Sequence, residues 1–599
     1  MLMLRNNQSR FAQIPQLDMQ RSTFDRPHGV KTTFNAGDLI PIYVNADILP
    51  GDTVNMDMSF VARMSTPIHP VMGNANIEFF WFFVPHRLVW DDFEHFITGG
   101  LDAGEWDAPT IYEHPAVRPK TRHADGSESE LGFPHKSLAD YMGIPVGTIF
   151  NELGTPIGWP DHKDGFNALP FRAYAKVWND WFRASSIQKE ILIPTTSGLV
   201  SPVVAEVADD SVFSTPLDDV QTSVYGGALL KANKYHDYFT SALLEPQRGE
   251  PVGIPLEGSM PITTKRSDES WEIPTNANPL MMVKQSSFGV NTSNTAFVAD
   301  YGVLGEGTPS SDTVGLGTVT SDSISNVSYM YPGNLIAYAD EHNTLQVSIN
   351  DLRHAIAVQH ILEIDARAGS GRYVDLLKGH FGVTSPDARL QRSEYLGGTS
   401  VPINVDQVLQ TSATNDVSPQ GNTAAFSLTA GSDGSFTKSF VEHGTLMCLA
   451  CVRHVHSYQQ GLNKMWFPKD RYDYYWPALS GISEQAILNK EIFLFGSSKI
   501  DNEVFGYQEA WANYRYHPDL VTGAMRSNYP QSLDVWHYAD DYVQTPHLSP
   551  EWLQEGCEEI DRTLAVSSAV EDQFIGDFYF NSRWYRVMPV YSVPGLDRL

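Results

Sequence analysis

Residues 77–84 read IEFFWFFV, and this run with five consecutive aromatic side chains constrains the fold more than any other stretch. Eight residues are too few to cross a bilayer, which takes about 20 apolar residues in a helix. Pro85 ends the run and Glu78 interrupts it. A short apolar run bounded by breaking residues is typical of a β-strand buried on both faces. We therefore predict a strand whose aromatic side chains are core or interface residues: Phe79, Phe80, Trp81, Phe82 and Phe83.

Two further stretches have strand patterns, and they lie near opposite ends of the chain. In residues 54–64, VNMDMSFVARM, apolar and polar side chains alternate, which predicts a strand with one buried face. Residues 573–595 are aromatic and β-branched, and Pro589 and Pro594 limit where they pair. The sheet must therefore be closed by pairing distant segments, as in Greek-key and jelly-roll folds. We expect an all-β jelly-roll sandwich with long loop insertions and a few packing helices.

Two segments predict helices that pack against these sheets. In residues 169–186, Pro170 suits the first turn of a helix, and apolar residues recur at three- and four-residue spacing. This stripe contains Tyr174, Val177, Trp178, Trp181 and Phe182. A second helix is predicted to begin at Ser348, which has capping-box spacing to Asp351, and to end near Gly369. We interpret Trp178 and Trp181 as core or interface residues, in preference to walls of a sugar-binding groove.

Three segments contain no Lys or Arg and are rich in Ser, Thr, Gly and Asp: residues 190–230, 285–330 and 393–437. Such composition predicts long surface excursions. The middle segment has the most loop-like composition. Its residues alone allow two interpretations, a projecting recognition loop or a flexible insertion without a role.

The charge of the chain is strongly negative but unevenly distributed. A formal net charge of −30 argues against a nucleic-acid partner for the chain as a whole. Charged residues make up 19% of the sequence, below the roughly 25% of typical domains, which predicts extensive protein interfaces. Residues 1–35, in contrast, form a basic arm. Its candidate contacts to DNA phosphates are Arg5, Arg10, Arg21, Arg26 and Lys31. The alternative is a disordered terminus with scattered charge.

No apolar stretch is long enough for a membrane span, and the opening MLMLRNNQSR turns polar after four residues. We therefore expect no membrane insertion, and we expect the chain to stay in the cytoplasm where it is made. Its three cysteines are too few for a disulfide framework, which fits that compartment.

Residues 444–461, GTLMCLACVRHVHSYQQG, contain a candidate zinc motif made of Cys448, Cys451, His454 and His456. Zinc sites place a C-x-x-C pair on a tight turn. The segment TLMCLACV instead predicts a buried strand, which would direct the two cysteines to opposite faces. We therefore predict that both thiols are packing residues. The two histidines would share one face, but the sequence offers no placed third ligand.

Adjacent carboxylates occur at Asp91-Asp92, Asp209-Asp210, Asp540-Asp541 and Glu558-Glu559. A glycosidase needs two carboxyl groups flanking one bond, whereas neighbours on a strand diverge. We expect these pairs to be solvated, with a divalent cation between like-charged surfaces as a lesser option. The main nucleotide-binding, zinc-protease and hydrolase motifs are absent. We therefore predict no catalytic residues and no cofactor. The alternative, a cytoplasmic β-rich carbohydrate-active enzyme, rests on these carboxylates and the 13 tryptophans.

The stretch from FDRPHGVKTTFNAGDLIPIYVNADILPG to DDFEHF, residues 24–96, resembles the amino-terminal part of gokushovirus major capsid proteins. Gokushoviruses are small single-stranded DNA phages of the microvirus family. Further blocks that resemble this family follow in the expected order at residues 169–183, 234–256, 380–404, 506–529 and 577–596. The resemblance therefore extends over nearly the whole chain.

This resemblance implies a jelly-roll capsid protein that assembles through pentamers into a T=1 icosahedral shell around circular single-stranded DNA. It also implies assembly in the host bacterial cytoplasm, a location in the virion and no catalytic residues. The implied partners are further copies of the chain, an internal scaffolding protein, a small basic DNA-binding protein, a DNA pilot protein and a host-cell receptor.

We expect four parts along the chain. Residues 1–35 form the basic arm, and residues 36–256 form the first part of the jelly-roll core with helical insertions. Residues 257–345, which match no block of the family, are expected to be a surface insertion that forms protrusions at the threefold axes and meets the host. Residues 346–599 form the second part of the core, with helices and carboxy-terminal strands.

Overall fold

The computed structural model describes residues 20–98, 112–117, 121–122, 128–129, 133, 135–146, 149–150, 156–157, 166–198, 227–250, 252, 262–266, 282–285, 329–332, 335–339, 349–368, 373–382, 391–412, 414, 419–421 and 423–591. The chain divides into two compact units. The larger comprises Met1–Arg248 and Leu362–Leu599, and the smaller comprises Gly249–Ile361.

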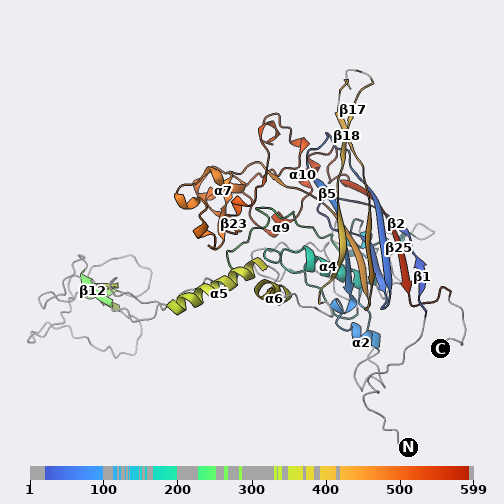
Figure 1. The fold of residues 1–599 in the computed structure, drawn as a ribbon, viewed down its shortest axis with the longest axis horizontal. Helices are drawn as coiled ribbons and strands as arrows, with labels where there is room; N and C mark the ends of the chain where they lie inside the picture. Colours follow the sequence, from blue (N-terminus) through green and yellow to red (C-terminus); the bar gives the residue numbers. More distant parts are fainter. Residues whose placement is uncertain are drawn as a thin grey trace, which may run out of the picture. The chain divides into compact units, whose positions relative to one another are not determined.

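Two antiparallel sheets form the centre of the larger unit (Figure 1). The first sheet contains, in order, β2 (His28–Phe34), β25 (Phe574–Arg586), β4 (Thr53–Met64) and β19 (Thr429–Ser439), and β1 (Ser22–Asp25) pairs with the far end of β25. The second contains β3 (Ile40–Ile48), β20 (Gly444–His454), β5 (Ala75–Pro85) and β16 (Glu394–Pro402). Apart from the step from β5 to β16, successive long strands alternate between the sheets. This is the jelly-roll arrangement, and the predicted fold class is confirmed.

The two ends of the chain meet in the first sheet. β25 lies between β2 and β4, with Phe574 opposite Met64 and Tyr585 opposite Thr53. In Figure 1 it is the red strand beside the blue ones. Burial alternates along β4, as the sequence pattern predicts, because one face of this sheet covers the core and the other is solvated. The expectation that distant segments pair is therefore confirmed.

The apolar space between the sheets, here called the sandwich core, is filled mainly by aromatic side chains. Phe79 contacts Phe578 edge-on, with ring centroids 5.9 Å apart, and Trp81 contacts Phe580 in the same way at 5.9 Å. Edge-to-face contacts of this kind add about 0.5–1.5 kcal/mol per pair to the stabilisation from buried area. They join β5 of the second sheet to β25 of the first.

β5 is buried on both faces, as its apolar run predicts. Phe79, Trp81 and Phe83 point into the sandwich core. Phe82 and Val84 point the other way, into a second apolar cluster formed with helix α4 (Leu169–Val177). The outer cover of β5 is therefore supplied by the chain's own insertion between β5 and β16.

The predicted helix at 169–186 is present as α4 and the π-helical turn η3 (Trp178–Phe182). Tyr174 donates from Oη to the carbonyl oxygen of Leu39 at 2.7 Å, and Trp178 is buried. In the π-turn the amide of Arg183 bonds to the carbonyl of Trp178 at 3.0 Å. Wider helical turns shift the following side chains around the axis, and Trp181 lies at the rim, 39% exposed.

The second predicted helix is present as α5 (Ile349–Ala368), although Ser348 lies outside the described residues. The prediction that it packs against a sheet is wrong, because none of residues 351–367 is buried. The apolar side chains of α5 are spread around the helix and form no single face. Within the smaller unit, β12 (Ile262–Arg266) pairs with β15 (Leu335–Ala339), and β13 (Met282–Gln285) pairs with β14 (Tyr329–Pro332).

Short elements occupy the connections of the larger unit. Between β16 and β19, β17 (Val405–Leu409) and β18 (Thr423–Ser427) form a projecting hairpin at the top of Figure 1. The other short strand pairs are β6 (Ala116–Val117) with β11 (Phe166–Asn167), β7 (Thr121–Arg122) with β8 (Glu128–Ser129), β9 (Ile149–Phe150) with β10 (Pro156–Ile157), β21 (Ser457–Tyr458) with β24 (Asp519–Leu520), and β22 (Gln485–Leu488) with β23 (Val504–Gln508).

The remaining short helices are α2 (Phe93–Thr98), α3 (Leu138–Tyr141), α6 (Tyr373–Phe381), α7 (Asn489–Ile492), α8 (Ser498–Asp501), α9 (Pro550–Leu553) and α10 (Glu558–Asp561). The 3-10 turns are η1 (His86–Leu88), η6 (Lys464–Trp466), η7 (Arg471–Asp473), η8 (Pro477–Leu479), η9 (Ala512–Tyr514), η10 (Gly523–Met525) and η11 (Asp534–Trp536). No helix in the described part of the chain is long and apolar enough to span a bilayer.

Candidate functional site

The described cations of the basic arm lie along β1 and β2, at the edge of the first sheet. Arg21, Arg26 and Lys31 are exposed, whereas Arg5 and Arg10 lie outside the described residues. The guanidinium of Arg26 lies 5.0 Å from the ring centroid of Trp584, and Lys31 pairs with Asp577 at 3.4 Å. These cations are thus placed on one edge of the sandwich, where a phosphate backbone has access to them. Contact with DNA stays a prediction.

The sequence patterns did not single out the cations that β25 adds to this edge. Arg583 pairs with Asp25 at 2.9 Å, and Arg586 pairs with Asp52 at 2.9 Å. Arg586 also lies over Trp584, with its guanidinium carbon 4.6 Å from the ring centroid. The strand pattern of residues 573–595 was the available signal, since it predicts that Arg583 and Arg586 lie on a strand. Because carboxylates lie between the cations, the edge carries mixed charge.

Some of the aromatic residues predicted to lie in the core or an interface point into the sandwich core, and others line a cavity on the outer face of the second sheet. Phe80 and Phe82 face away from the sandwich core, towards a cavity of about 640 Å³ that Trp181 and Tyr395 also line. Arg392 lies over Trp181, with its guanidinium carbon 4.6 Å from the ring centroid. Trp178 is buried beneath α4 and donates from Nε1 to the carbonyl of Lys231 at 2.9 Å. Of the three tryptophans predicted to be core or interface residues, Trp81 and Trp178 are buried and Trp181 is accessible to solvent.

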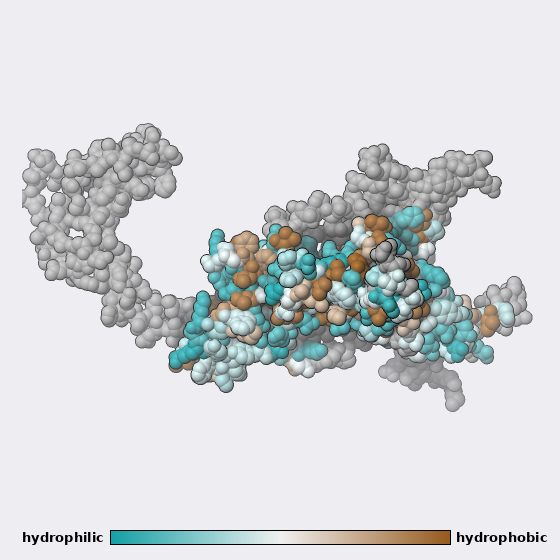
Figure 2. Space-filling view, turned by 90° about the horizontal axis from the view of Figure 1, so that it is seen from above, coloured by the Kyte–Doolittle hydropathy of each residue, from teal (hydrophilic) through white to brown (hydrophobic). Residues whose placement is uncertain are grey.

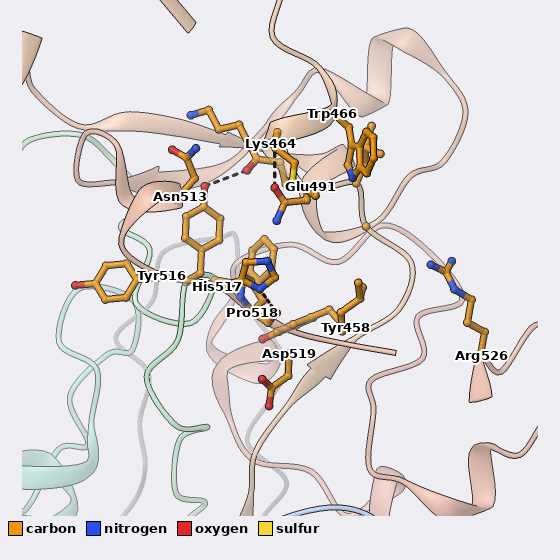
Figure 3. Close-up of a pocket in the computed structure, with 17 residues that line it drawn as sticks. Tyr458, Lys464, Trp466, Glu491, Asn513, Tyr516, His517, Pro518, Asp519 and Arg526 are labelled. Atoms are coloured by element: carbon orange, nitrogen blue, oxygen red, sulfur yellow. Dashed lines mark hydrogen bonds between the residues drawn. The ribbon is translucent and has the colours of Figure 1, made fainter. Parts of the chain in front are cut away.

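A smaller cavity, of about 210 Å³, lies in the insertion between β20 and β25, and Figure 3 shows its lining. Tyr458, Trp466 and Tyr516 supply its aromatic walls, and Lys464 and Glu491 lie together at one end (Figure 3). Tyr238 donates from Oη to Glu491 at 3.0 Å, and burial raises the pKa of this carboxyl group. The lining also contains the carboxylate of Asp519.

Exposed aromatic side chains are concentrated in the same insertion. We call this set the aromatic surface: Trp466, Tyr472, Tyr474, Tyr475, Trp476, Tyr514, Tyr516 and Tyr529. The most exposed of them, Trp466, is 69% exposed. Figure 2 shows hydrophobic and hydrophilic residues intermixed over the face that it presents. Tyrosine and tryptophan are enriched at the centres of protein interfaces. This surface therefore has the composition of a protein-binding face.

The cysteines of the candidate zinc motif lie where the strand pattern predicts. Cys448 belongs to the sandwich core and Cys451 to the cluster on the opposite face of β20. Both are buried, and burial raises the pKa of the Cys451 thiol. The two thiols cannot share a metal ion, because they lie on opposite faces of the strand.

The two histidines of that motif instead belong to a buried polar cluster with two carboxylates that sequence reasoning missed. His456 contacts Asp540 at 2.6 Å through Nδ1 and Glu555 at 3.1 Å through Nε2. His454 Nδ1 lies 2.5 Å from Glu555 Oε1. Burial alone would lower the pKa of His456, but the two carboxylates raise it to about 9. All four side chains are at least 95% buried.

The expectation that adjacent carboxylates are solvated is wrong for Asp540, which is 1% exposed, although Asp541 is exposed. Lys234 lies 3.3 Å from Asp540 Oδ2, and Tyr542 donates to the same oxygen at 2.5 Å. Burial would raise the pKa of Asp540, but Lys234 and His456 hold it well below its usual range. Partners from distant segments therefore make burial of this carboxylate favourable, and no local pattern indicates them.

Comparison with known proteins gives a match over nearly the whole chain. The family model described as capsid protein (F protein) matches residues 12–596. Capsid protein VP1 of Spiroplasma virus 4 is 40% identical over 97% of this chain and 96% of its own length. The corresponding proteins of Bdellovibrio phage phiMH2K and Chlamydia phage 1 are 38% and 37% identical, over 98% and 99% of this chain and 98% of their own lengths. The resemblance expected from the sequence is confirmed, and the alternative of a carbohydrate-active enzyme finds no support.

The contrast between Asp540 and Asp541 is testable by substitution. Asp540→Asn removes the buried counter-charge of Lys234 and one of the two carboxylates that contact His456, so we expect it to lower the free energy of unfolding by about 3–5 kcal/mol. Asp541→Asn, at the exposed neighbour, serves as the matched control and changes it by about 0.5 kcal/mol or less. Urea denaturation of the purified chain measures both. Equal effects of the two substitutions would contradict the role assigned to Asp540.

Proposed function

This chain belongs to the phage capsid protein (F protein) family, and we propose that its copies close, through pentamers, into a small T=1 icosahedral shell around circular single-stranded DNA. The observation that carries the proposal is the family match over residues 12–596, which includes every strand of the jelly roll. The protein is a structural capsid protein and not an enzyme. Its place is the virion.

The aromatic surface supports the proposal that copies of the chain bind to one another. Side chains such as Trp466 and Tyr472, 69% and 55% exposed, would bury apolar area between neighbouring copies. A stable interface buries about 800 Å² on each partner, and aromatic anchors supply much of its energy. The hollow beside Trp181 offers a second set of such anchors. Interfaces of this kind would offset the repulsion between copies that each carry a charge of −30.

The smaller unit supports a separate role for the insertion. We infer that residues 257–345, which fall within Gly249–Ile361, form the protrusions at the threefold axes and contact a host-cell receptor. Its low content of Lys and Arg would keep such a loop from binding the genome. The remaining proposed partners are an internal scaffolding protein, a small basic DNA-binding protein and a DNA pilot protein, and assembly is proposed to occur in the host bacterial cytoplasm.

The basic arm supports contact with the genome. Arg21 and Arg26 are exposed on the edge of the first sheet, and Arg5 and Arg10 precede them in the sequence. Contacts from such an arm would be directed at phosphates and indifferent to base sequence. Because the rest of the chain is acidic, the small basic partner would neutralise most of the genome.

Assembly is tested by size-exclusion chromatography and electron microscopy of the full-length chain from cells that also produce the other phage proteins. We expect megadalton particles or pentamer-sized precursors. Trp466→Asp should shift the chain from particles to smaller species, because it places a charge in a surface that must lose water. Asn502→Asp adds the same charge at an exposed position of the same insertion and should leave particles intact. A wild-type chain that remains a monomer or small oligomer would contradict the proposal.

Genome contact is tested by replacing Arg5, Arg10, Arg21 and Arg26 together with Ala. Because phosphate contacts are lost while the sheets remain, the DNA content per particle should fall and shells should still form. Quantitative PCR of nuclease-treated particles measures the packaged DNA. Lys499→Ala, at an exposed cation on α8, is the control and should package normally. Unchanged DNA content in the arginine variant would contradict the proposed contact between the basic arm and the genome.

A further inference from the structure

Four donor side chains converge at the end of β20. His454 is the last residue of the strand and His456 follows two positions later, and their ring centroids lie 4.1 Å apart. One donor atom each of His454, His456 and Asp540 lies within 4.8 Å of the other two. Glu555 approaches both rings, with Oε1 2.5 Å from His454 and Oε2 3.1 Å from His456. The third ligand that the sequence did not offer is therefore supplied by the insertion between β20 and β25.

The imidazole of His454 is buried without a hydrogen-bond partner among the described residues. Its side chain is fully buried, and this lack applies to both ring nitrogens. Nδ1 approaches Glu555 to 2.5 Å, but the contact does not have the geometry of a hydrogen bond. A buried polar atom without a partner is destabilising by about 1–3 kcal/mol. A ligand seated between these side chains would satisfy this ring.

The charges around the site also favour a cation. The carboxylates of Asp540, Glu555 and Glu559 surround it, and Oε2 of Glu559 is buried without a hydrogen-bond partner among the described residues. The ammonium of Lys234 is the permanent cation in this cluster. A divalent ion bound here would replace the proton that Asp540 and Glu555 stabilise on His456.

We propose that His454, His456 and Asp540 form a structural binding site for one divalent transition-metal ion, with Zn²⁺ as the best match and Glu555 orienting the His456 ring from its opposite edge. Two imidazoles and one carboxylate suit Zn²⁺, whereas Ca²⁺ and Mg²⁺ prefer sites made of oxygen atoms alone. Metal–ligand distances of about 2.0–2.2 Å place tetrahedral ligands about 3.4 Å apart. The 2.6 Å contact between His456 Nδ1 and Asp540 Oδ1 therefore needs to open by about 1 Å. Glu555 lies at the other ring nitrogen, Nε2, where a carboxylate that accepts the remaining N–H orients a metal-binding imidazole.

The ion would fasten the insertion to the sandwich. His454 and His456 belong to the end of β20, whereas Asp540 and Glu555 come from two separate loops of the insertion. The amide of Glu555 already donates to the carbonyl of Ala232 at 2.9 Å. A metal ion at this point would cross-link the end of β20 to the loop of Asp540, and Glu555 would hold the third segment through its contact with His456. The three ligand side chains are at least 95% buried, so no substrate reaches the ion and the site is structural, not catalytic.

The site is tested on untagged, full-length chain purified as particles. The particles are loaded with Zn²⁺, dialysed exhaustively and analysed by inductively coupled plasma mass spectrometry. We expect about one Zn²⁺ per chain for the wild type. The variants His454→Gln and His456→Gln should lose it, and His517→Gln, at an exposed histidine of the same insertion, should retain it.

A second measurement uses the wild-type chain and so does not depend on whether the histidine variants fold. Chelator-stripped wild-type chain is titrated with Co²⁺, whose visible absorption is intense in a tetrahedral site and is abolished when Zn²⁺ displaces it. We expect a saturable signal at about one equivalent, and a higher thermal midpoint with metal than without it. The proposal is overturned by wild-type chain that retains no Zn²⁺ and gives no Co²⁺ signal. It is equally overturned by folded His454 and His456 variants that retain as much Zn²⁺ as the wild type.

Discussion

The contact between the aromatic side chains of β5 and β25 is the interaction on which the rest of the structure depends. Phe79 and Trp81 meet Phe578 and Phe580 between the two sheets, so residues near opposite ends of the chain share one core. Burial of apolar area contributes about 25 cal/mol per Å², and ordering a residue costs about 1–2 kcal/mol. Strands this rich in aromatic residues can offset the ordering of the long insertions between them. The insertions in turn cover the outer face of β5 with α4, so scaffold and insertions stabilise each other.

Much of the scaffold is predictable from the sequence because its signals are local. The unbroken apolar run of β5, the alternation along β4 and the apolar segment around Cys448 and Cys451 each specify a strand and its buried faces. The stripe around Trp178 likewise specifies α4. The packing of α5 was not predictable in this way, because helical spacing and capping describe a helix without showing what covers it. Burial of Asp540 was missed for a related reason, since its partners Lys234 and His456 come from distant parts of the chain.

The insertion between β20 and β25 connects the fold to its function. It carries the aromatic surface that would meet neighbouring copies, and its base holds the buried cluster around His456. An interface needs its anchors held in place before binding, since ordering them on contact reduces affinity. The buried cluster is thus positioned to fix the surface relative to the sandwich. Electrostatic repulsion between acidic copies is screened beyond about 8 Å at physiological salt, which leaves the short-range apolar contacts to decide assembly.

The central claim is that β25 pairs with β4 in the register that places Tyr579 opposite Ser59. The most direct test is oxidative cross-linking of a Ser59→Cys, Tyr579→Cys double variant, followed by mass spectrometry of the linked peptides. Both positions lie on the exposed face of the sheet, and we expect an intramolecular disulfide in high yield. In the control, Ser59→Cys with Arg583→Cys, the second cysteine lies four residues along β25, about 13 Å out of register, and should not cross-link. Absence of the first disulfide, or equal yields from both variants, would contradict the account.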